Sequence, residues 1–446
     1  MKLGVVLHGV TGRMGDVAHR ALKDIVARGG VAVDGDTVVP VPIGLGRDVA
    51  KLAAYARENG LAEHSTVLAE ALDRAREINP DCQLYHNAVA TGARHRVLLA
   101  ALPMLDPSTT GVFCEKPVAA NYAEGWDVVE ALERGRFVHG VVHDMLQTPG
   151  FRKALALVPV IQPTSCQTLF GYEVGDGKSD NPAFRGQRPD FNWRLAEAGG
   201  GIILDMCHEA YVSHALFGTT ERLSAVARMF VGERVSAATD ERLGARLEST
   251  PSGVSVPRAA SPLRPEGRDS ERVACDVEDY AAIRREHTSG VVNNSVWTWC
   301  RRINSEFGPL EITVEGRLGT IVFGLGGLKV QWKESAPALR WEDILEGRPL
   351  DWRSFWDYPE VAVRNAFAAE LERFIRCLML REPYPYDATR ALDWLGEVEA
   401  IYESAAQGGA PISHNAFLHY PDKVPPDWTP ERLQGHLSAS GPRVHG

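Results

Sequence analysis

The first fifteen residues contain the feature that most limits how this chain can fold. An apolar strand-like segment, KLGVVLHG, runs directly into VTGRMG and then into a helical pattern, so that glycines 9, 12 and 15 form a GxxGxxG loop. Glycine permits a tight turn and a close backbone approach to a pyrophosphate, which the N-terminus of the following helix can bind. The pattern predicts a dinucleotide-binding strand–loop–helix unit, and a plain structural turn is the alternative.

The periodicity of the chain changes near residue 150. Residues 1–150 alternate strand-like and helix-like segments, which predicts a doubly wound parallel sheet of the Rossmann type. Residues 151–411 contain strands with two-faced alternation, as in VVNNSVWT, which predicts an α+β domain with a large, open, mainly antiparallel sheet. Within it, residues 239–274 are rich in Arg, Ser, Pro and Gly and are expected to be a flexible insertion. Residues 412–446 are expected to be a Pro-rich C-terminal extension.

Composition argues against several classes of protein. The 446 residues carry a net charge of −10, which argues against a nucleic-acid partner or an acidic membrane surface. Seven cysteines are scattered without a CxxC pair, so we expect a reduced, cytoplasmic protein. No apolar run approaches the roughly 20 residues of a membrane span, and the N-terminus does not have the pattern of a signal peptide.

The end of the second predicted strand bears on the choice of cofactor. An acid at this place normally binds the adenosine ribose of NAD. Here Gly46 occupies the place and Arg47 follows, which leaves room and positive charge for the 2′-phosphate of NADP. An Arg47 that lies in solvent or stacks on adenine is compatible with NAD. Both cofactors therefore stay open, in exchangeable or tightly bound form.

One position of the first loop departs from the usual fingerprint, because Val10 stands where its first glycine normally stands. The residues expected to contact the dinucleotide lie in this loop and after later strands. They are Gly9, Thr11, Gly12, Arg13, Met14, Gly46, Arg47, Thr91, Glu115 and Lys116.

Two further motifs contain candidate catalytic residues. Lys116, in CEKP, follows a predicted strand at the carboxyl edge of the parallel sheet, where ligands bind; an exposed ion pair with Glu115 is its alternative role. Asp205 and His208 follow three glycines in EAGGGIILDMCHEA, and we expect the glycines to bring the chain close to the cofactor. Residues three apart share a helix face, and histidine suits proton transfer near neutral pH. A buried histidine bonded to a carbonyl is the alternative for His208.

Together, GxxGxxG, EKP and the WR…GGG…D..H pattern resemble the Gfo/Idh/MocA oxidoreductases over nearly the whole chain. The resemblance implies hydride transfer between a nicotinamide and a hydroxyl-bearing carbon, commonly in a sugar or cyclic polyol. It implies that Lys116 polarises the substrate oxygen, that His208 is the acid/base, and that Asp205 orients the substrate or the histidine. It also implies a homodimer or homotetramer formed through the C-terminal sheet. The chain departs from the family because His208 follows Asp205 by three residues, and Glu209 takes the usual fourth place.

Three functional hypotheses follow. The first is an NAD(P)-dependent dehydrogenase of a sugar, cyclic polyol or glycoside. The second is an NAD-dependent glycoside hydrolase that works through a transient 3-keto sugar, by oxidation, elimination, hydration and reduction. The third is a non-catalytic cofactor-binding sensor. The second hypothesis needs an additional base, for which the candidates are His143, Asp144, Tyr172 and Glu173.

The expected substrate is a small carbohydrate, and several arginines would suit an anionic sugar because guanidinium binds such groups bidentately. The expected substrate contacts are Asp144, Tyr172, Arg188, Trp193 and Arg194. No metal site is expected, since no His/Cys pair has the spacing of metal ligands.

Overall fold

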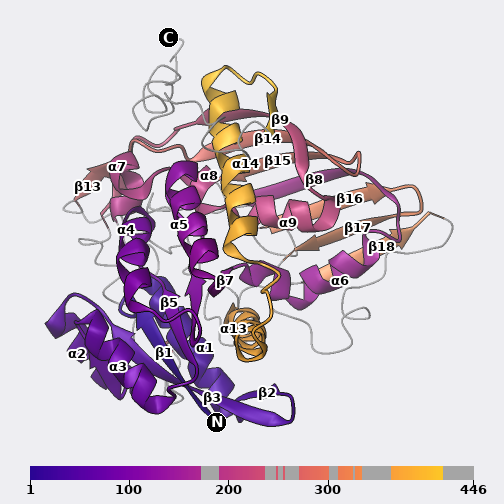
Figure 1. Cartoon of the computed structure of the whole chain (residues 1–446). Helices are drawn as coiled ribbons and strands as arrows, with labels where there is room; N and C mark the ends of the chain where they lie inside the picture. Colours follow the sequence, from indigo (N-terminus) through magenta and orange to yellow (C-terminus); the bar gives the residue numbers. More distant parts are fainter. Residues whose placement is uncertain are drawn as a thin grey trace. The chain divides into compact units, whose positions relative to one another are not determined.

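The computed structural model describes residues 1–171, 190–236, 248–249, 255–256, 271–300, 310–324, 327–333 and 363–414. The chain forms two compact units (Figure 1). The first consists of Met1–Gln147 with Arg364–Leu395, and the second of Thr148–Val363 with Gly396–Gly446. The first boundary lies close to the expected one at residue 150, whereas the return of Arg364–Leu395 to the first unit was not foreseen. Most of the expected insertion and extension lies outside the described residues.

A sheet that is parallel except for the edge strand β2, which pairs antiparallel with β3, forms the centre of the first unit. Its strand order is β2-β3-β1-β5-β6-β7, and β4 also pairs with β3. The strands are β1 (Lys2–His8), β2 (Val31–Val33), β3 (Asp36–Leu45), β4 (Glu63–Ser65), β5 (Gln83–Asn87), β6 (Thr110–Cys114) and β7 (Val138–Val141). β1 pairs in parallel with both β3 and β5, so the chain changes direction across the sheet at β1. In open parallel sheets, ligands bind at such a switch point, outside the carboxyl ends of the strands.

Helices connect these strands, as the alternating pattern predicts. They are α1 (Arg13–Ala27), α2 (Val49–Asn59), α3 (Leu68–Ile78), α4 (Thr91–Ala101) and α5 (Tyr122–Gly135), joined by α13 (Val363–Leu380) from the second half of the chain. α13 packs into the core of this unit, where Phe367, Leu371 and Phe374 lie with strand residues such as Leu3 and Val5. Each buried side chain of this kind contributes about 1.5–3 kcal/mol of hydrophobic free energy, which explains why α13 belongs to the first unit.

The second unit contains an eight-stranded sheet in the order β18-β17-β16-β8-β15-β14-β9-β19. The strands are β8 (Pro163–Gly171), β9 (Thr220–Arg228), β14 (Tyr280–His287), β15 (Val292–Thr298), β16 (Leu310–Gly316), β17 (Gly319–Gly324), β18 (Gly327–Trp332) and β19 (Ile412–Ser413). All neighbours are antiparallel except β8 and β15. The structure therefore confirms the predicted fold class, a Rossmann-type parallel sheet followed by a mainly antiparallel one.

Short helices cover one face of this sheet. α6 (Pro149–Leu157), α8 (Ile202–Asp205) and α9 (His208–Phe217) lie on it (Figure 1). α7 (Leu195–Ala198) precedes α8, and α14 (Ala388–Ala406) contains the boundary between the two units. Two small ribbons pair β10 (Glu233–Val235) with β13 (Arg272–Ala274) and β11 (Glu248–Ser249) with β12 (Ser255–Val256).

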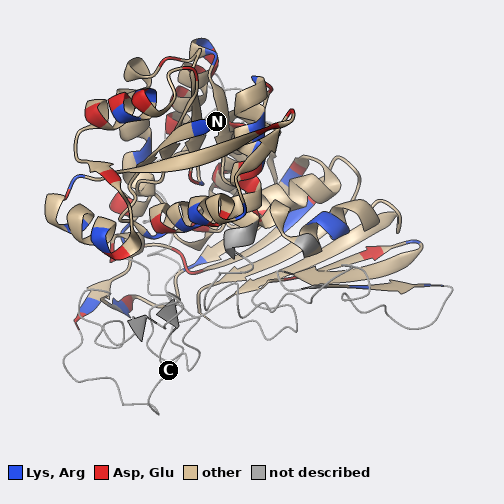
Figure 2. Cartoon of the chain, turned by 90° about the horizontal axis from the view of Figure 1, so that it is seen from below, with Lys and Arg blue, Asp and Glu red and all other residues tan. Residues whose placement is uncertain are grey.

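Charge is distributed unevenly over the elements. Acidic and basic side chains are interspersed on the helices of the first unit, whereas the strands of the large sheet are mostly uncharged (Figure 2). β8, β15 and β17 contain no charged residue. Among the described residues, no helix is long and apolar enough to cross a membrane.

Candidate active site

The glycine loop after β1 has the geometry that its spacing predicts. Gly9 adopts φ +88°, a left-handed conformation that side chains rarely tolerate, and its N–H donates to the Leu45 carbonyl at 2.8 Å. A Cβ on Gly15 would lie 2.2 Å from the Gly9 carbonyl oxygen, so only glycine lets α1 approach the loop this closely. Gly12 is the N-cap of α1 and supplies no side-chain hydrogen bond to the first turn. A pyrophosphate is the kind of anion that such a helix start can accept.

The unusual Val10 does not obstruct the loop. Its side chain is fully buried and packs toward Gly44 in β3, where an added Cβ would lie 3.1 Å from Val10 Cγ1. The core beneath the loop therefore accommodates a valine side chain at the position where the fingerprint has its first glycine.

The predicted cofactor residues share the carboxyl edge of the parallel sheet, because each follows a strand that points the same way. Gly46 and Arg47 follow β3, Thr91 begins α4 after β5, and Glu115 and Lys116 follow β6. Gly46 is half-buried and Arg47 is exposed. The nearest acid cannot replace the missing ribose ligand easily, since Asp48 caps α2 by accepting from the Lys51 N–H at 2.9 Å.

Lys116 lies beside two buried carboxyl groups. Glu115 is 1% exposed, and burial raises its pKa to about 7 although the charges of Arg94 and Lys116 oppose the shift. Asp144, after β7, is 6% exposed; burial raises its pKa as well, against the charge of Lys116. The Lys116–Pro117 peptide bond is cis. The arrangement sets an ammonium group beside two carboxyl groups whose pKa values burial raises.

The helix predicted to carry Asp205 and His208 is interrupted between them. α8 ends at Asp205 and α9 begins at His208. Met206, with φ −98° and ψ 31°, leaves the helical conformation, and the Glu209 N–H bonds back only three residues, to the Met206 carbonyl at 3.3 Å. The expectation of one continuous helix was wrong, so the three-residue spacing does not fix how these two side chains lie.

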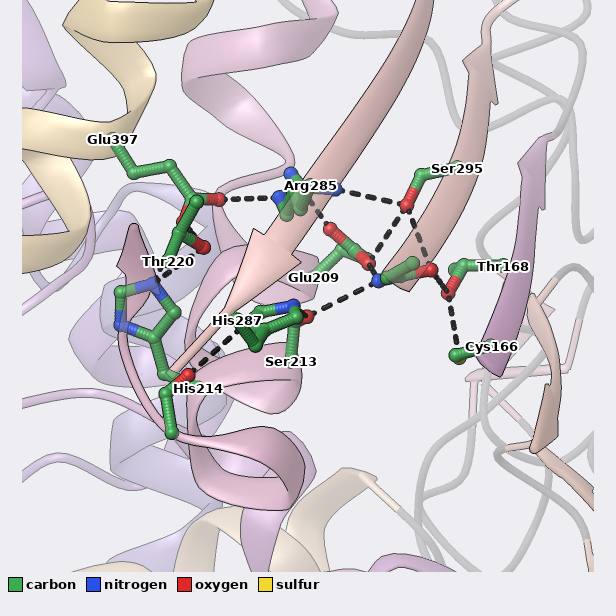
Figure 3. A network of polar contacts seen from close by, with 12 residues as sticks. Cys166, Thr168, Glu209, Ser213, His214, Thr220, Arg285, His287, Ser295 and Glu397 are labelled. Atoms are coloured by element: carbon green, nitrogen blue, oxygen red, sulfur yellow. Dashed lines mark hydrogen bonds and ion pairs between the residues drawn. The ribbon is translucent and has the colours of Figure 1, made fainter. Parts of the chain in front are cut away.

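The structure separates the roles of His208 and Glu209. His208 is 9% exposed, and its Nδ1 lies 2.5 Å from the Tyr211 hydroxyl. Glu209 is 2% exposed and forms an ion pair with Arg285 at 2.9 Å while accepting from Ser295 at 3.0 Å (Figure 3). Glu209 is thus held in a buried network on the sheet, and the acid/base role of His208 stays a prediction.

The three glycines before α8 have a local structural cause. A Cβ on Gly200 would lie 2.2 Å from the Tyr402 hydroxyl, and one on Gly201 would lie 2.0 Å from the Glu278 carbonyl oxygen. Gly200 and Gly201 thus pack against Tyr402 and Glu278, and a close approach of these glycines to the cofactor stays a prediction. Sequence reasoning missed both partners because they lie far along the chain.

Two predicted substrate contacts have other roles in the structure. Trp193 is fully buried, with Arg234 5.0 Å above its ring and Trp299 edge-on at 5.6 Å. We correct this prediction: Trp193 is a core residue. Arg194 is 53% exposed and forms an ion pair with Glu197 at 2.9 Å.

The remaining predicted site residues are Tyr172, Glu173, Arg188, His143 and Asp144. Tyr172, Glu173 and Arg188 lie outside the described residues. His143, a candidate second base, is 1% exposed, and its Nδ1 lies 2.6 Å from the Val141 carbonyl. Asp144 remains the candidate base with a polar position at the sheet edge.

Within the described residues, one group combines side chains of the metal-ligand types: His214, Glu397 and His414. Sequence spacing gave no signal for it, because the last two are distant from the first. The carboxylate of Glu397 is already satisfied, since His214 lies at 2.7 Å, Thr220 donates at 2.6 Å and Arg285 donates at 2.6 Å. We therefore assign the group to a buried hydrogen-bond network, of which Figure 3 shows His214 and Glu397.

Comparison with known proteins gives the class to which the fold belongs. No family model matches the sequence. A D-xylose dehydrogenase from Paenarthrobacter nicotinovorans is 28% identical over 383 residues, which cover 83% of this chain and 87% of that protein.

Solved structures resemble the chain over most of its length. A levoglucosan dehydrogenase in complex with NADH and levoglucosan has a TM-score of 0.68 at 18% identity, covering 93% of this chain and 99% of its own. An oxidoreductase domain protein from Kribbella flavida has a TM-score of 0.69 at 16% identity, with 93% and 99% covered. The chain has the two-part fold that these oxidoreductases share.

Proposed function

We propose that this protein is an NAD(P)-dependent oxidoreductase of the Gfo/Idh/MocA type, which transfers hydride between nicotinamide and a secondary hydroxyl of a small carbohydrate. The observation that carries the proposal is the position of Lys116, among buried carboxyl groups, at the sheet edge that bears the glycine loop. The names of the relatives, a D-xylose dehydrogenase and a levoglucosan dehydrogenase, support a sugar substrate.

The residues of the first unit fit a dinucleotide. The glycine loop and the start of α1 would hold the pyrophosphate, and Gly46 with Arg47 would face the adenosine end. NAD is the first cofactor to test, because similar structures were solved with NADH or NAD+. When bound, the nicotinamide supplies the carbon that accepts or returns hydride.

The chain's own side chains would handle the proton. Lys116 would donate a hydrogen bond to the reacting hydroxyl and lower its pKa, because an ammonium stabilises the developing oxyanion. His208 would take the hydroxyl proton as hydride leaves, and the neighbouring Tyr211 hydroxyl orients its ring. Asp205, half-buried at the end of α8, would orient the substrate or the histidine.

A turnover assay tests the proposal directly. The purified full chain is mixed with NAD or NADP and a panel of sugars that includes D-xylose and levoglucosan, and the absorbance of reduced nicotinamide is followed. We expect turnover, and we expect Lys116→Met to lower kcat by about 100-fold, in the range of acid–base contributions, with a smaller loss of cofactor affinity. Lys51→Met, an exposed lysine of α2, is the control. A chain that binds neither cofactor would contradict the proposal.

Asp144 favours a second candidate reaction, the NAD-dependent hydrolysis of a glycoside. A transient ketone at C3 acidifies the C–H at C2, and the elimination then needs a base with a pKa nearer 7 than that of a free carboxylate. Burial raises the pKa of Asp144 in this direction, beside Lys116. Release of a chromogenic aglycone with catalytic NAD, and solvent deuterium at C2 of the product, would support hydrolysis over net oxidation. Cofactor binding without either turnover would favour a sensor.

We also propose that the protein is a homo-oligomer formed through the large sheet of the second unit. The face of this sheet away from α6, α8 and α9 carries half-buried apolar side chains, among them Leu169, Val226 and Val296.

A further inference from the structure

Glu278 lies in the loop before β14 and is enclosed by the start of α8. Its side chain is fully buried. The backbone of Gly200 and Gly201 passes so close that a Cβ on Gly201 would lie 2.9 Å from the Glu278 carboxyl carbon. A run of glycines is therefore needed here because the chain must wrap around an acidic side chain.

One residue binds three successive N–H groups at the start of α8. The Glu278 carboxylate accepts from Gly201 at 3.0 Å and from Ile203 at 2.9 Å. The Glu278 backbone carbonyl accepts from Ile202 at 3.0 Å. Negative charge at a helix N-terminus is stabilising, and hydrogen bonds to a carboxylate are stronger than neutral ones.

Tyr402, on α14, fixes the carboxylate from the other side. Its hydroxyl donates to Glu278 Oε1 at 2.9 Å. Burial raises the pKa of Glu278 to about 7, although the bonds from Ile203 and Tyr402 oppose the shift. Burying a charged carboxylate at this place is costly in free energy. An amide of the same size would avoid the buried charge. The carboxylate is therefore expected to do more than fill space.

The first turn of α8 leads directly to the candidate catalytic residues. The Asp205 N–H bonds to the Gly201 carbonyl at 3.0 Å, and the Met206 N–H bonds to the Ile202 carbonyl at 2.8 Å. α8 is a single turn, and α9 begins at His208. The backbone at Gly201 and Ile202 consequently sets where Asp205 lies and where the next helix starts.

We propose that Glu278 is a positioning residue, which with Tyr402 holds the first turn of α8 and, through it, orients Asp205 and His208 for proton transfer. The inference rests on the proposed function and deepens it, because it assigns a role to a fully buried residue that is not among the predicted cofactor or substrate contacts.

The test compares Glu278→Gln and Tyr402→Phe with Glu130→Gln. Glu130 lies on α5 and pairs with Arg134 at the surface, so it is a control for the loss of a carboxylate. Hydrogen exchange of peptides spanning residues 199–208, cofactor affinity, kcat and KM are measured for each full-length variant. We expect E278Q to accelerate exchange in this segment by about tenfold or more and to lower kcat by about tenfold, while KM and cofactor affinity change little. Y402F shifts the exchange rate and kcat in the same direction by less, and E130Q leaves the exchange rate and kcat unchanged.

Each outcome decides a different point. Unchanged exchange at 199–208 in E278Q would overturn the role of Glu278 in holding α8. Faster exchange with unchanged kcat would overturn its role in positioning. If E278Q does not fold, Y402F, which removes one hydroxyl, decides both points in the same way. If the wild-type chain turns over no sugar, the proposed function fails, and the positioning role fails with it, while exchange still shows whether Glu278 holds α8.

Discussion

Arg47 is the residue on which the discrimination between NAD and NADP is expected to depend. It is exposed after β3, and no acid at position 46 repels a 2′-phosphate. We expect Arg47→Ala to weaken NADPH binding by about tenfold or more, the range of a hydrogen bond to a charged group, and NADH binding much less. Fluorescence titration of both reduced cofactors measures this, with Arg57→Ala, which removes an exposed arginine of α2, as control. An equal loss for both cofactors would show that Arg47 does not read the 2′-phosphate.

Two groups of glycines show what a residue pattern can and cannot reveal. Gly9 and Gly15 were recognisable because their constraint is local: a left-handed φ at one and a close helix–loop approach at the other, within six positions. Gly200 and Gly201 are equally constrained, but by Glu278 and Tyr402. A constraint that comes from partners distant in sequence leaves only the glycines visible, so the sequence did not reveal the packing against Glu278 and Tyr402.

At the scale of elements, a buried ionic network joins α9, β14 and the second-unit part of α14. Arg285 of β14 is fully buried between Glu209 and Glu397, at 2.9 and 2.6 Å (Figure 3). Ser295 accepts a further bond from its guanidinium at 2.9 Å. Removing the arginine leaves two carboxylates buried without a compensating charge, so we expect Arg285→Met to lower the free energy of unfolding by about 3–5 kcal/mol at neutral pH.

An exposed arginine of α5 provides the control for that prediction. Arg134 is 75% exposed and pairs with Glu130. We expect Arg134→Met to cost less than about 1 kcal/mol, as exposed ion pairs do. Urea unfolding of the three proteins measures the difference. Similar losses for both variants would mean that the buried pairs add nothing beyond a surface pair.

The pH dependence of this network follows from the Glu397 carboxyl. Burial opposes its ionisation, but the charge of Arg285 and the bond from His214 hold its pKa well below the ordinary value. A depressed acid pKa stabilises the folded state above the unfolded-state pKa, and this stability is lost as pH falls through the folded-state value. In Arg285→Met, the same burial would favour the protonated form. We therefore expect the stability difference between wild type and variant to shrink on acidification.

The sequence predicted which segments form helices and strands better than it predicted where a helix is interrupted or which segments pack together. The alternation of strand-like and helix-like segments predicted the parallel sheet, and the two-faced strands predicted the mainly antiparallel sheet. Both patterns reflect burial along a single strand or helix, so they are visible in the sequence. The break at Met206 and Cys207 was not visible, since no glycine or proline marks it. Glu209 was a rival to His208 in the sequence for the same reason: its partners Arg285 and Ser295 lie on strands far along the chain.

At the scale of the whole molecule, chain order was a poor guide to which segments pack together. The sequence divides near residue 150, but α13 returns to the first unit. Gly111 of β6 shows the fit, because an added Cβ would lie 2.7 Å from Leu378 of α13. An amphipathic helix carries no mark of which sheet it covers, so only the folded core identifies its partner.

The open face of the large sheet gives the last prediction, the oligomeric state. Leu169, Val226 and Val296 are half-buried there, and no described element covers them. Arg284 and Glu286 bring both signs of charge to this face, which suits a two-fold related copy because each charge can then meet its opposite.

A stable interface buries about 800 Å² on each partner, and a charge at its centre would remain desolvated without a counter-ion. We therefore expect wild-type protein to be a dimer or tetramer in light scattering, and Val296→Lys to shift it toward monomer. Val49→Lys, at a valine that is 69% exposed at the start of α2, introduces the same charge elsewhere and should leave the mass unchanged. If the wild-type protein is a monomer, a second copy does not cover this face. If V296K leaves the oligomer intact, the interface lies on another surface.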